Sequence, residues 1–284
     1  MKTVSIAALV VILFIPLWLL VAVPQFTGLP EDFTYTADVF SLDNFYNTDR
    51  MVYLEQQISK TDFSYEVEKK EDDVLIIKNI FDVRTLTDQK IFSVERLYGI
   101  DPKTGKHVSG YGDKDREGYL FAPKNLKAGE PFTYWHINYD GPAQMEFQAV
   151  EVLYGLPVYR YTAQYHADQT ENLDHLPGVP ETRGIDLDIN LTLWLEPVTG
   201  RMIKYEDDTI AYYYDQATKE RLYPWNHFHN RFTGPSVKEQ VEIAVTEKQR
   251  LFIFKTVVPF LLMIAALSLL VYGLVRTKRR SSIV

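Results

Sequence analysis

Cysteine is absent from this chain of 284 residues. Without a thiol, the protein has no disulfide bond, no thiolate nucleophile and no cysteine-ligated zinc or iron–sulfur site. If the folded part lies outside the cell, noncovalent packing alone must stabilise it. The 4 Trp, 19 Tyr and 16 Phe residues give an aromatic content typical of ordered, β-rich domains.

The common sequence signatures of catalysis are also missing. The chain has no G-x-S-x-G, P-loop, G-x-G-x-x-G or H-E-x-x-H motif. His227 and His229 could contribute to a metal site, but no third ligand is identifiable. The D-x-D-x-N run at 186–190 has Pro197 where a calcium loop has glutamate. We therefore predict no catalytic, cofactor-binding or metal site, no cofactor, and a protein that is not an enzyme.

Positive charge is scarce in the middle of the chain. All 38 acidic residues lie between Pro24 and Arg250, together with 24 of the 30 basic residues, so this segment carries 24 − 38 = −14. Such an acidic body repels the phosphates of nucleic acids, which excludes a nucleic-acid partner. The other six basic residues lie near the two ends of the chain.

Long apolar runs are present at both ends of the chain. Residues 4–23 are almost wholly apolar, and twenty such residues form a helix of about 30 Å, the thickness of a bilayer core. A cleavable signal peptide is the alternative, although its apolar region usually has only about 7–15 residues. From the length of the run we predict an uncleaved N-terminal transmembrane helix over residues 1–24.

The second apolar run, residues 256–275, lies between Lys255 and Arg276 and precedes a basic tail at 277–284. Basic clusters flanking a span stay in the cytoplasm, and Lys2 acts more weakly in the same direction. The sequence therefore predicts a cell-membrane protein with two spans, both termini cytoplasmic, and residues 25–235 as an extracellular domain.

A long helix is predicted over residues 236–276, leading into the C-terminal span. Ser236 and Glu239 form a capping box after Pro235. An apolar stripe follows, and we expect it to rest against the extracellular domain. Its members are Val237, Val241, Ala244 and Val245.

Within the extracellular domain, apolar residues recur every second position. In residues 184–197, Ile and Leu alternate with mostly polar residues, which is typical of a half-buried antiparallel strand. Further strands are predicted at 63–69, 73–83, 90–100, 145–155, 157–166 and 201–215. A helix is expected at 51–58, a short turn at 171–176, and solvated turns at Asp72-Asp73 and Asp207-Asp208. The predicted fold class is mainly β, α+β overall: an antiparallel-sheet domain flanked by a transmembrane helix at each terminus.

One turn pattern occurs twice. The two sets are Asp101, Pro102, Thr104 and Gly105, and Glu196, Pro197, Thr199 and Gly200. Proline favours the second position of a type I turn, and glycine tolerates the left-handed conformation, so both are predicted to be structural hairpin turns. Residues 215–218 are a degraded third copy. The repetition also suggests two similar lobes, residues 31–141 and 142–234.

Several stretches resemble a family of archaeal and actinobacterial membrane-anchored envelope proteins, the porin PorA family. The resemblance spans nearly the whole chain. It rests on the apolar ends and on four stretches: RLYGIDPKTG at 96–105, YWHINYD at 134–140, YGLPVY at 154–159 and WLEPVTG at 194–200. The resemblance implies a membrane-anchored outer domain and supplies no catalytic residues.

These observations favour a non-catalytic envelope protein whose extracellular domain binds a lipid, another apolar molecule or an envelope protein. A channel or transporter component is the first alternative. It predicts charged or polar residues inside the spans to line a path, and the two apolar runs contain no Asp, Glu, Lys, Arg or His. An extracellular hydrolase is the second alternative, because catalytic carboxylates need not be close in sequence. The oligomeric state stays open.

Overall fold

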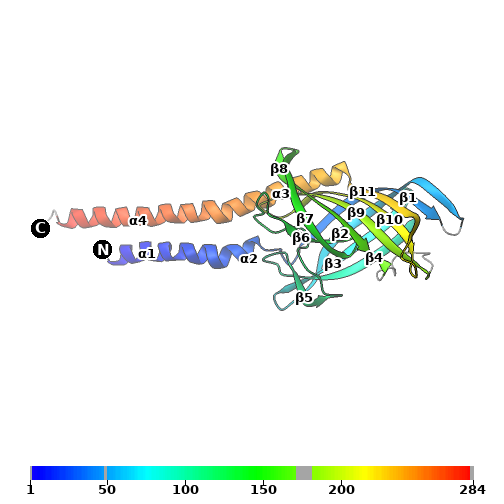
Figure 1. Ribbon diagram of the computed structural model, residues 1–284. Coiled ribbons are helices and arrows are strands. Elements are labelled where there is room, and N and C mark those ends of the chain that lie inside the picture. Colours follow the sequence, from blue (N-terminus) through cyan, green and yellow to red (C-terminus); the bar gives the residue numbers. More distant parts are fainter. Residues whose placement is uncertain (1, 48–49, 171–180, 282–284) are drawn as a thin grey trace. The chain divides into compact units, whose positions relative to one another are not determined.

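The alternating segments form one antiparallel sheet of eleven strands (Figure 1). The computed structural model describes residues 2–47, 50–170 and 181–281. The strands lie in the order β5-β4-β3-β2-β1-β11-β10-β9-β8-β7-β6. Their bounds are β1 Thr34–Asn47, β2 Val52–Glu71, β3 Val74–Thr85, β4 Lys90–Ile100, β5 His107–Gly112, β6 Phe132–His136, β7 Gly141–Leu153, β8 Leu156–Asp168, β9 Arg183–Leu195, β10 Met202–Asp215 and β11 Arg221–Phe232.

The first and last strands of the sequence pair at the middle of the sheet. Val39 in β1 lies opposite Phe232 in β11, while every other neighbouring pair is consecutive in sequence. This pairing joins the strands of both expected lobes into one sheet. Residues Glu31–Val245 form one compact unit, here called the β unit, and the expected boundary at residue 142 falls inside β7.

The two edges of the sheet are held together by the segment between β5 and β6. Tyr119 forms β-bridges to Lys106 on one side and to Tyr134 in β6 on the other. The backbone N–H of Tyr119 donates to the carbonyl of Thr133, and that of Leu120 donates to the carbonyl of Gly105, both at 3.0 Å. The sheet therefore curls until its edges meet one segment, and one face becomes an interior.

Apolar and aromatic side chains fill this interior. The apolar positions predicted for β9 are all buried, as the two-residue period requires. Rings from several strands pack on the segment after β5: Tyr35 lies 4.5 Å from Phe121 between centroids, and Tyr65 lies 5.3 Å from the same ring. Such aromatic pairs bury large apolar surfaces and stabilise this end of the sheet.

The predicted helix at 51–58 is wrong, because Val52–Glu71 form β2. The apolar pattern of this segment fits a helix locally, but pairing with β1 decides the outcome: Tyr53 lies opposite Tyr46. Gln56 has φ +53°, which no right-handed helix accommodates, and it sits where the β1–β2 register shifts. The turn expected at 171–176 lies outside the described residues.

The hairpin pattern has the same geometry at each occurrence. The N–H of Gly105 donates to the carbonyl of Asp101 at 2.8 Å, and that of Gly200 donates to the carbonyl of Glu196 at 2.9 Å. In each loop the acidic side chain also accepts a hydrogen bond from the threonine hydroxyl. The third copy closes in the same way, with Lys219 at φ +63° in place of glycine.

Replacing Gly200 with alanine is expected to destabilise the β unit more than the same change at Gly105. Both glycines have φ +76°, where alanine costs about 1 kcal/mol. A Cβ at Gly200 would also lie 2.5 Å from the carbonyl oxygen of Ala122, whereas a Cβ at Gly105 meets nothing within 4 Å. Urea unfolding of both variants checks this; equal losses would contradict the packing argument.

The long C-terminal helix is present. Helix α3 (Gly234–Phe252) continues through a π-helical turn (Ile253–Val257) into α4 (Val258–Ser281). On α3, Val237, Val241 and Ala244 are buried, whereas Val245 is exposed. Three of the four members of the predicted apolar stripe are therefore packed within the β unit.

The cap of this helix lies earlier than predicted. The helix begins at Gly234, because proline is tolerated in a first helical turn and Pro235 does not stop it. Thr233 is the capping residue: its hydroxyl accepts the N–H of Ser236 at 3.4 Å. Ser236 instead accepts the N–H of Asp38 at 2.8 Å, which ties the helix to β1, and Glu239 has no place in a capping box.

The second compact unit consists of Met1–Pro30 and Thr246–Val284. Its N-terminal part is helical from α1 (Lys2–Leu17) through a π-helical turn (Trp18–Ala22) to α2 (Val23–Thr27). The Trp18 indole donates to the carbonyl of Phe254 at 3.0 Å, and Phe26 stacks on the ring of Phe254.

Within the described residues, one helix is long and apolar enough to cross a membrane. This helix is Gly234–Val275, and the apolar stretch Ile6–Ala22 is shorter, with 17 residues. The expectation of such a helix at each terminus is therefore met at the C-terminus alone, because the apolar N-terminal stretch falls below the length of a typical span.

Candidate functional site

A buried polar network lies on the inner face of the sheet, where β6 and its following turn approach β10. His136 Nε2 lies 3.1 Å from the Asp207 carboxylate, and the Asn138 amide donates to the same oxygen at 2.7 Å. The Tyr205 hydroxyl donates to this oxygen at 3.0 Å, and the Tyr165 hydroxyl lies 2.7 Å from His136 Nδ1. Five polar side chains from distant parts of the sequence thus satisfy one another.

Strand alternation places Asp207 inside and Asp208 outside. Asp207 is 0% exposed and continues the inward row of Tyr205 and Thr209, so the solvated turn predicted for this pair is wrong. Burial raises the pKa of Asp207, but attraction to His136 and hydrogen bonds from His136, Thr209 and Asn138 outweigh burial and lower the pKa below its ordinary value. The carboxylate is therefore ionised at neutral pH.

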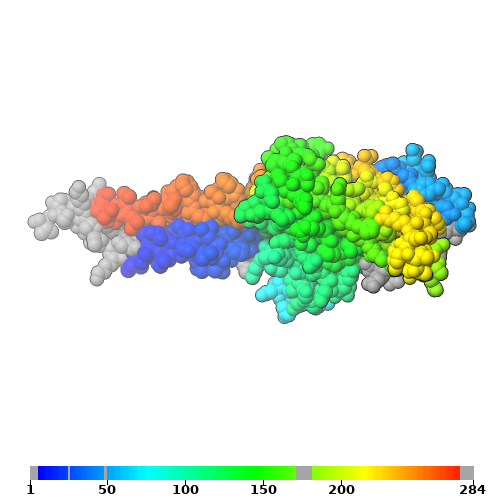
Figure 2. Space-filling model, viewed as in Figure 1, coloured from blue at the N-terminus to red at the C-terminus, as the bar shows by residue number. Residues whose placement is uncertain are grey.

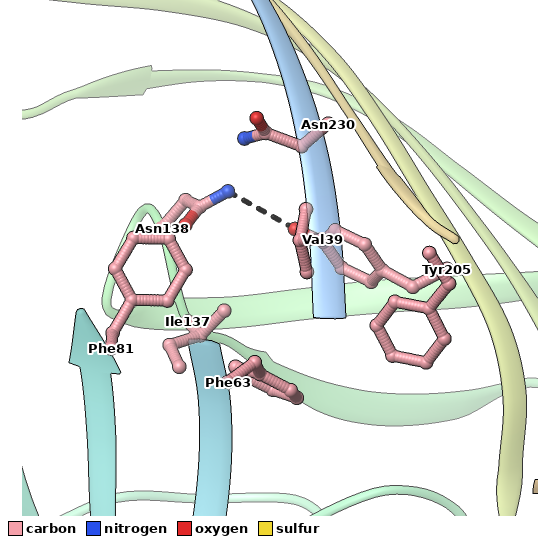
Figure 3. Close-up of a pocket in the computed structure, with 8 residues that line it drawn as sticks. Val39, Phe63, Phe81, Ile137, Asn138, Tyr205 and Asn230 are labelled. Carbon is pink, nitrogen blue, oxygen red and sulfur yellow. Dashed lines mark hydrogen bonds between the residues drawn. The ribbon is translucent and has the colours of Figure 1, made fainter. Parts of the chain in front are cut away.

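A small cavity adjoins this network (Figure 3). Its volume is about 10 Å³, which is room for one water molecule. Most of its lining is apolar, and Asn138, Tyr205 and Asn230 add polar groups. The lining residues are Val39, Phe63, Phe81, Ile137, Asn138, Tyr205, Asn230 and Phe232.

The turn between β6 and β7 forms one wall of the cavity. Ile137 is 2% exposed, and it and Asn138 contact the space that β1, β2, β3, β10 and β11 line from the other sides. Asp140, at the end of the same turn, has φ +54°, which is uncommon for a residue other than glycine. The turn is thus held in a strained form with an apolar side chain inside the sheet.

Three cations surround the carboxylate of Asp140. Lys114 Nζ lies 2.8 Å from Asp140 Oδ2, Arg96 Nε lies 3.5 Å from it, and Arg116 Nε lies 3.6 Å from Oδ1. The Trp135 indole donates to Oδ1 at 2.8 Å. Burial raises the pKa of Asp140, but Arg96, Lys114, Trp135 and Arg116 together lower it, so the carboxylate stays charged.

An uncharged histidine lies beside this ion cluster. His107 is in ring contact with Tyr98 and Trp135. Burial, reinforced by the charge of Arg116, lowers the pKa of His107 to about 3, against a weaker opposing effect of Asp140. The cluster therefore gains no further positive charge from His107 at neutral pH.

The residues of the two sequence patterns that resemble metal sites make other contacts. Arg221 donates to both Asp186 (2.7 Å) and Asp188 (2.8 Å), so these two carboxylates are paired with a guanidinium. His227 lies 2.7 Å from Asp208, and His229 lies 3.6 Å from it. Across the described ranges, no three His, Cys, Asp or Glu side chains converge as metal ligands.

The two groups at the centre of the inner network are buried, while Asn138 and Tyr165 at its rim are partly exposed. His136 and Asp207 are of the residue types found in catalytic triads, but their exposed fractions are 1% and 0%. Figure 2 shows the side chains of β7 and β8, in green, forming a continuous surface on one face of the β unit. In this conformation, neither His136 nor Asp207 is accessible to a substrate in solution.

Sequence reasoning noticed some of these residues without assigning them a role. The YWHINYD stretch supplies Trp135, His136, Asn138 and Asp140, and RLYGIDPKTG supplies Arg96. The two predicted hairpin sets, which begin at Asp101 and Glu196, form the turns between strands. None of their residues lines the cavity or belongs to the ion cluster. For Asp207, the available signal was the two-residue period running through Tyr205 and Thr209.

Two solved structures share a distant likeness. A Bacteroides fragilis protein with a YmcC-like fold is 9% identical, with 69% of this chain and 92% of that chain covered and a TM-score of 0.32. LprF from Mycobacterium bovis is 12% identical, with 78% of this chain and 91% of that chain covered and a TM-score of 0.26. No curated protein matches the chain.

A protein-family model also matches the chain, over nearly its whole length. The family described as Porin PorA matches residues 6–275, which include the helices of both ends, the ion cluster, the inner network and the cavity. Because this match runs through nearly the whole sequence, the chain belongs to the Porin PorA family.

Proposed function

We propose that this protein is a membrane-anchored envelope protein whose β unit binds an apolar molecule inside the curled sheet, without catalysing a reaction. The observation that carries the proposal is the cavity under the β6–β7 turn. Five of its eight lining residues are apolar, namely Val39, Phe63, Phe81, Ile137 and Phe232. Such a lining attracts a hydrocarbon chain.

The helical unit supports two spans with both termini in the cytoplasm. Helices α1 and α4 place the N- and C-termini at the same end of the helical unit (Figure 1). The apolar stretch Ile6–Ala22 lies near the lower limit for a bilayer span, about 17 residues, and its Trp18 is hydrogen-bonded to the backbone of the longer helix. With the basic tail in the cytoplasm, residues 31–245 lie on the outer side.

Ligand entry requires the cavity to grow. A volume of about 10 Å³ holds one water and no alkyl chain. The β6–β7 turn is the element that can enlarge it, because it carries Ile137 into the interior and its own backbone is strained at Asp140. Outward movement of Ile137 would leave its space to the ligand. The polar groups of Asn138 and Asn230 would then face the guest.

Capture by a photoreactive alcohol tests the proposal. Full-length protein in phosphatidylcholine nanodiscs is irradiated with diazirine-bearing hexadecanol, and the labelled peptides are mapped by mass spectrometry. We expect labelling in β1–β3 as well as in α1 and α4. Labelling of the helices, which face lipid in any case, serves as the internal standard. Wild-type protein labelled only in the helices would remove the proposal.

Val39→Phe is expected to reduce labelling of the β unit about tenfold, because the larger ring fills the cavity that Val39 lines. Phe81→Ala is expected to raise labelling, since it enlarges the same space. Val152→Phe is the matched control: Val152 is 65% exposed, so the same change should leave labelling intact. A loss with Val152→Phe equal to that with Val39→Phe would contradict the assignment.

A further inference from the structure

We infer that Arg96 and Arg116 form a binding site for the anionic head group of an amphipathic ligand, and that the carboxylate of Asp140 fills this site in the ligand-free protein. The inference rests on the proposed function and extends it from an apolar chain to a chain with a carboxylate or phosphate at one end.

The guanidinium of Arg96 is the main observation. Arg96 is 7% exposed, yet its side chain has one polar partner among the described residues, Asp140, at the long distance of 3.5 Å. A guanidinium carries five N–H donors, and a buried one is normally hydrogen-bonded in full. Here its side chain donates no hydrogen bond within the described part of the chain, so its donors are available to an incoming anion.

Arg116 adds a second guanidinium, whose Nη1 already donates to the carbonyl of Leu97 at 2.9 Å and to Asp113, while its Nε has no hydrogen-bond partner among the described residues. It is 6% exposed and stacks on the ring of Tyr98 at 4.3 Å. Its Nε is buried without a hydrogen-bond partner and lies 3.6 Å from Asp140. The Nε atoms of both arginines thus face one carboxylate at distances longer than a typical hydrogen bond, and these two donors form an incompletely filled anion site.

The local charge favours an anion. Arg96, Lys114 and Arg116 contribute three positive charges, and Asp113 and Asp140 contribute two negative ones. The side chain of Lys114 is 39% exposed, so solvent reaches this end of the cluster. A further negative charge is therefore attracted to the cluster and has a route to it.

The position of Asp140 connects this site to the cavity. Asp140 ends the turn whose Ile137 and Asn138 wall the cavity, so the ion cluster and the apolar space lie on opposite ends of one four-residue turn. When an anionic head group takes the place of Asp140, the turn loses its tether to Arg96 and Arg116. The same event that binds the head group would thus release Ile137 and open the space for the chain.

The test compares two probes that differ only in the head group. Full-length protein in phosphatidylcholine nanodiscs is titrated with diazirine-bearing palmitic acid and, separately, with diazirine-bearing hexadecanol. For Arg96→Gln, we expect capture of the acid in the β unit to weaken about tenfold, the loss of one charge-assisted contact, and capture of the alcohol to stay unchanged. Arg84→Gln on β3 is the matched control, because Arg84 pairs with Asp82 away from the cavity.

Asp140→Asn provides a second variant with the opposite expectation. It keeps the shape of the side chain but removes the competing charge, so capture of the acid should rise severalfold. A fall in acid capture would overturn the idea that Asp140 competes with the ligand. Equal acid capture by Arg96→Gln and wild-type protein, with melting temperatures showing both folded, would overturn the head-group site.

The two proposals fail in distinguishable ways. If neither probe labels the β unit of wild-type protein, the proposed function fails. If the alcohol labels the β unit and Arg96→Gln captures the acid as well as wild-type protein does, only the head-group site fails. Competition by millimolar inorganic phosphate would assign the site to free anions as well, whereas acid capture that phosphate does not reduce would assign it to the lipid head group.

Discussion

Replacing Asp207 with asparagine is expected to lower the free energy of unfolding of the β unit by about 3–5 kcal/mol, the usual cost of breaking a buried charged pair. Asp207 is 0% exposed, and its carboxylate accepts hydrogen bonds from Asn138, Tyr205 and Thr209 while facing His136. An asparagine amide would place its own N–H donors where the donors of Asn138, Tyr205 and Thr209 already point. His136 would also lose its charged partner at a position that is only 1% exposed.

Asp208 supplies the matched control. It lies next to Asp207 in β10, but on the outer face, with its side chain 47% exposed and in contact with His227 at 2.7 Å. Exposed pairs of this kind contribute about 0–1 kcal/mol, so Asp208→Asn should cost less than 1 kcal/mol. The contrast between two neighbouring aspartates tests burial itself, because residue type, strand and substitution are the same.

The difference between wild-type protein and Asp207→Asn should depend on pH in one direction. The folded-state pKa of Asp207 is below its ordinary value, so its stabilising contribution is fully present above the unfolded-state pKa, about 3.9. The contribution is lost as the pH falls through the folded-state pKa. The gap between the two proteins should therefore be present at pH 5 and narrow below about pH 4.

Urea unfolding of full-length protein in detergent, followed by near-UV circular dichroism of the many tyrosines, measures these differences. A loss of less than 1 kcal/mol for Asp207→Asn would mean that the network contributes little to the fold. A gap that widened in acid would mean that the carboxylate is not ionised in the folded state. Either result would contradict the description of the inner network given above.

The strands could be predicted because each local pattern agreed with the final sheet. In β9 the alternation of Ile and Leu with polar residues names the buried face directly, and Asp101 and Glu196 begin turns that their own side chains complete. The prediction for residues 51–58 was wrong because the apolar residues of so short a segment fit either period. Pairing with β1, which a single sequence does not reveal, decides that segment.

The site was harder to predict than the strands for a different reason. Arg96 and Asp140 are 44 residues apart in sequence, and His136 and Asp207 are 71 apart. Their proximity follows from the curl of the sheet, which depends on the β1–β11 pairing and on the bridges through Tyr119. The charged residues looked like surface residues in sequence, because nothing near them identified a buried partner.

Single cysteines are expected to give all-or-none labelling of the two sides of the membrane. The native chain has no cysteine, so each introduced thiol reports without background. Met51 is 72% exposed in the β unit, and Ser281 ends α4. In intact cells, Met51→Cys should react with a membrane-impermeant maleimide, while Ser281→Cys should react only after permeabilisation, because the basic residues before it hold that end in the cytoplasm.

Thr3→Cys decides whether the N-terminal helix crosses the membrane. If Ile6–Ala22 spans the bilayer beside α4, Thr3→Cys should behave like Ser281→Cys and react only after permeabilisation. A thiol at residue 3 that reacts in intact cells would place the N-terminus outside and leave one span, and a label absent from purified protein would indicate cleavage. Labelling of Ser281→Cys but not of Met51→Cys in intact cells would place the β unit in the cytoplasm, where it could bind no ligand from the envelope.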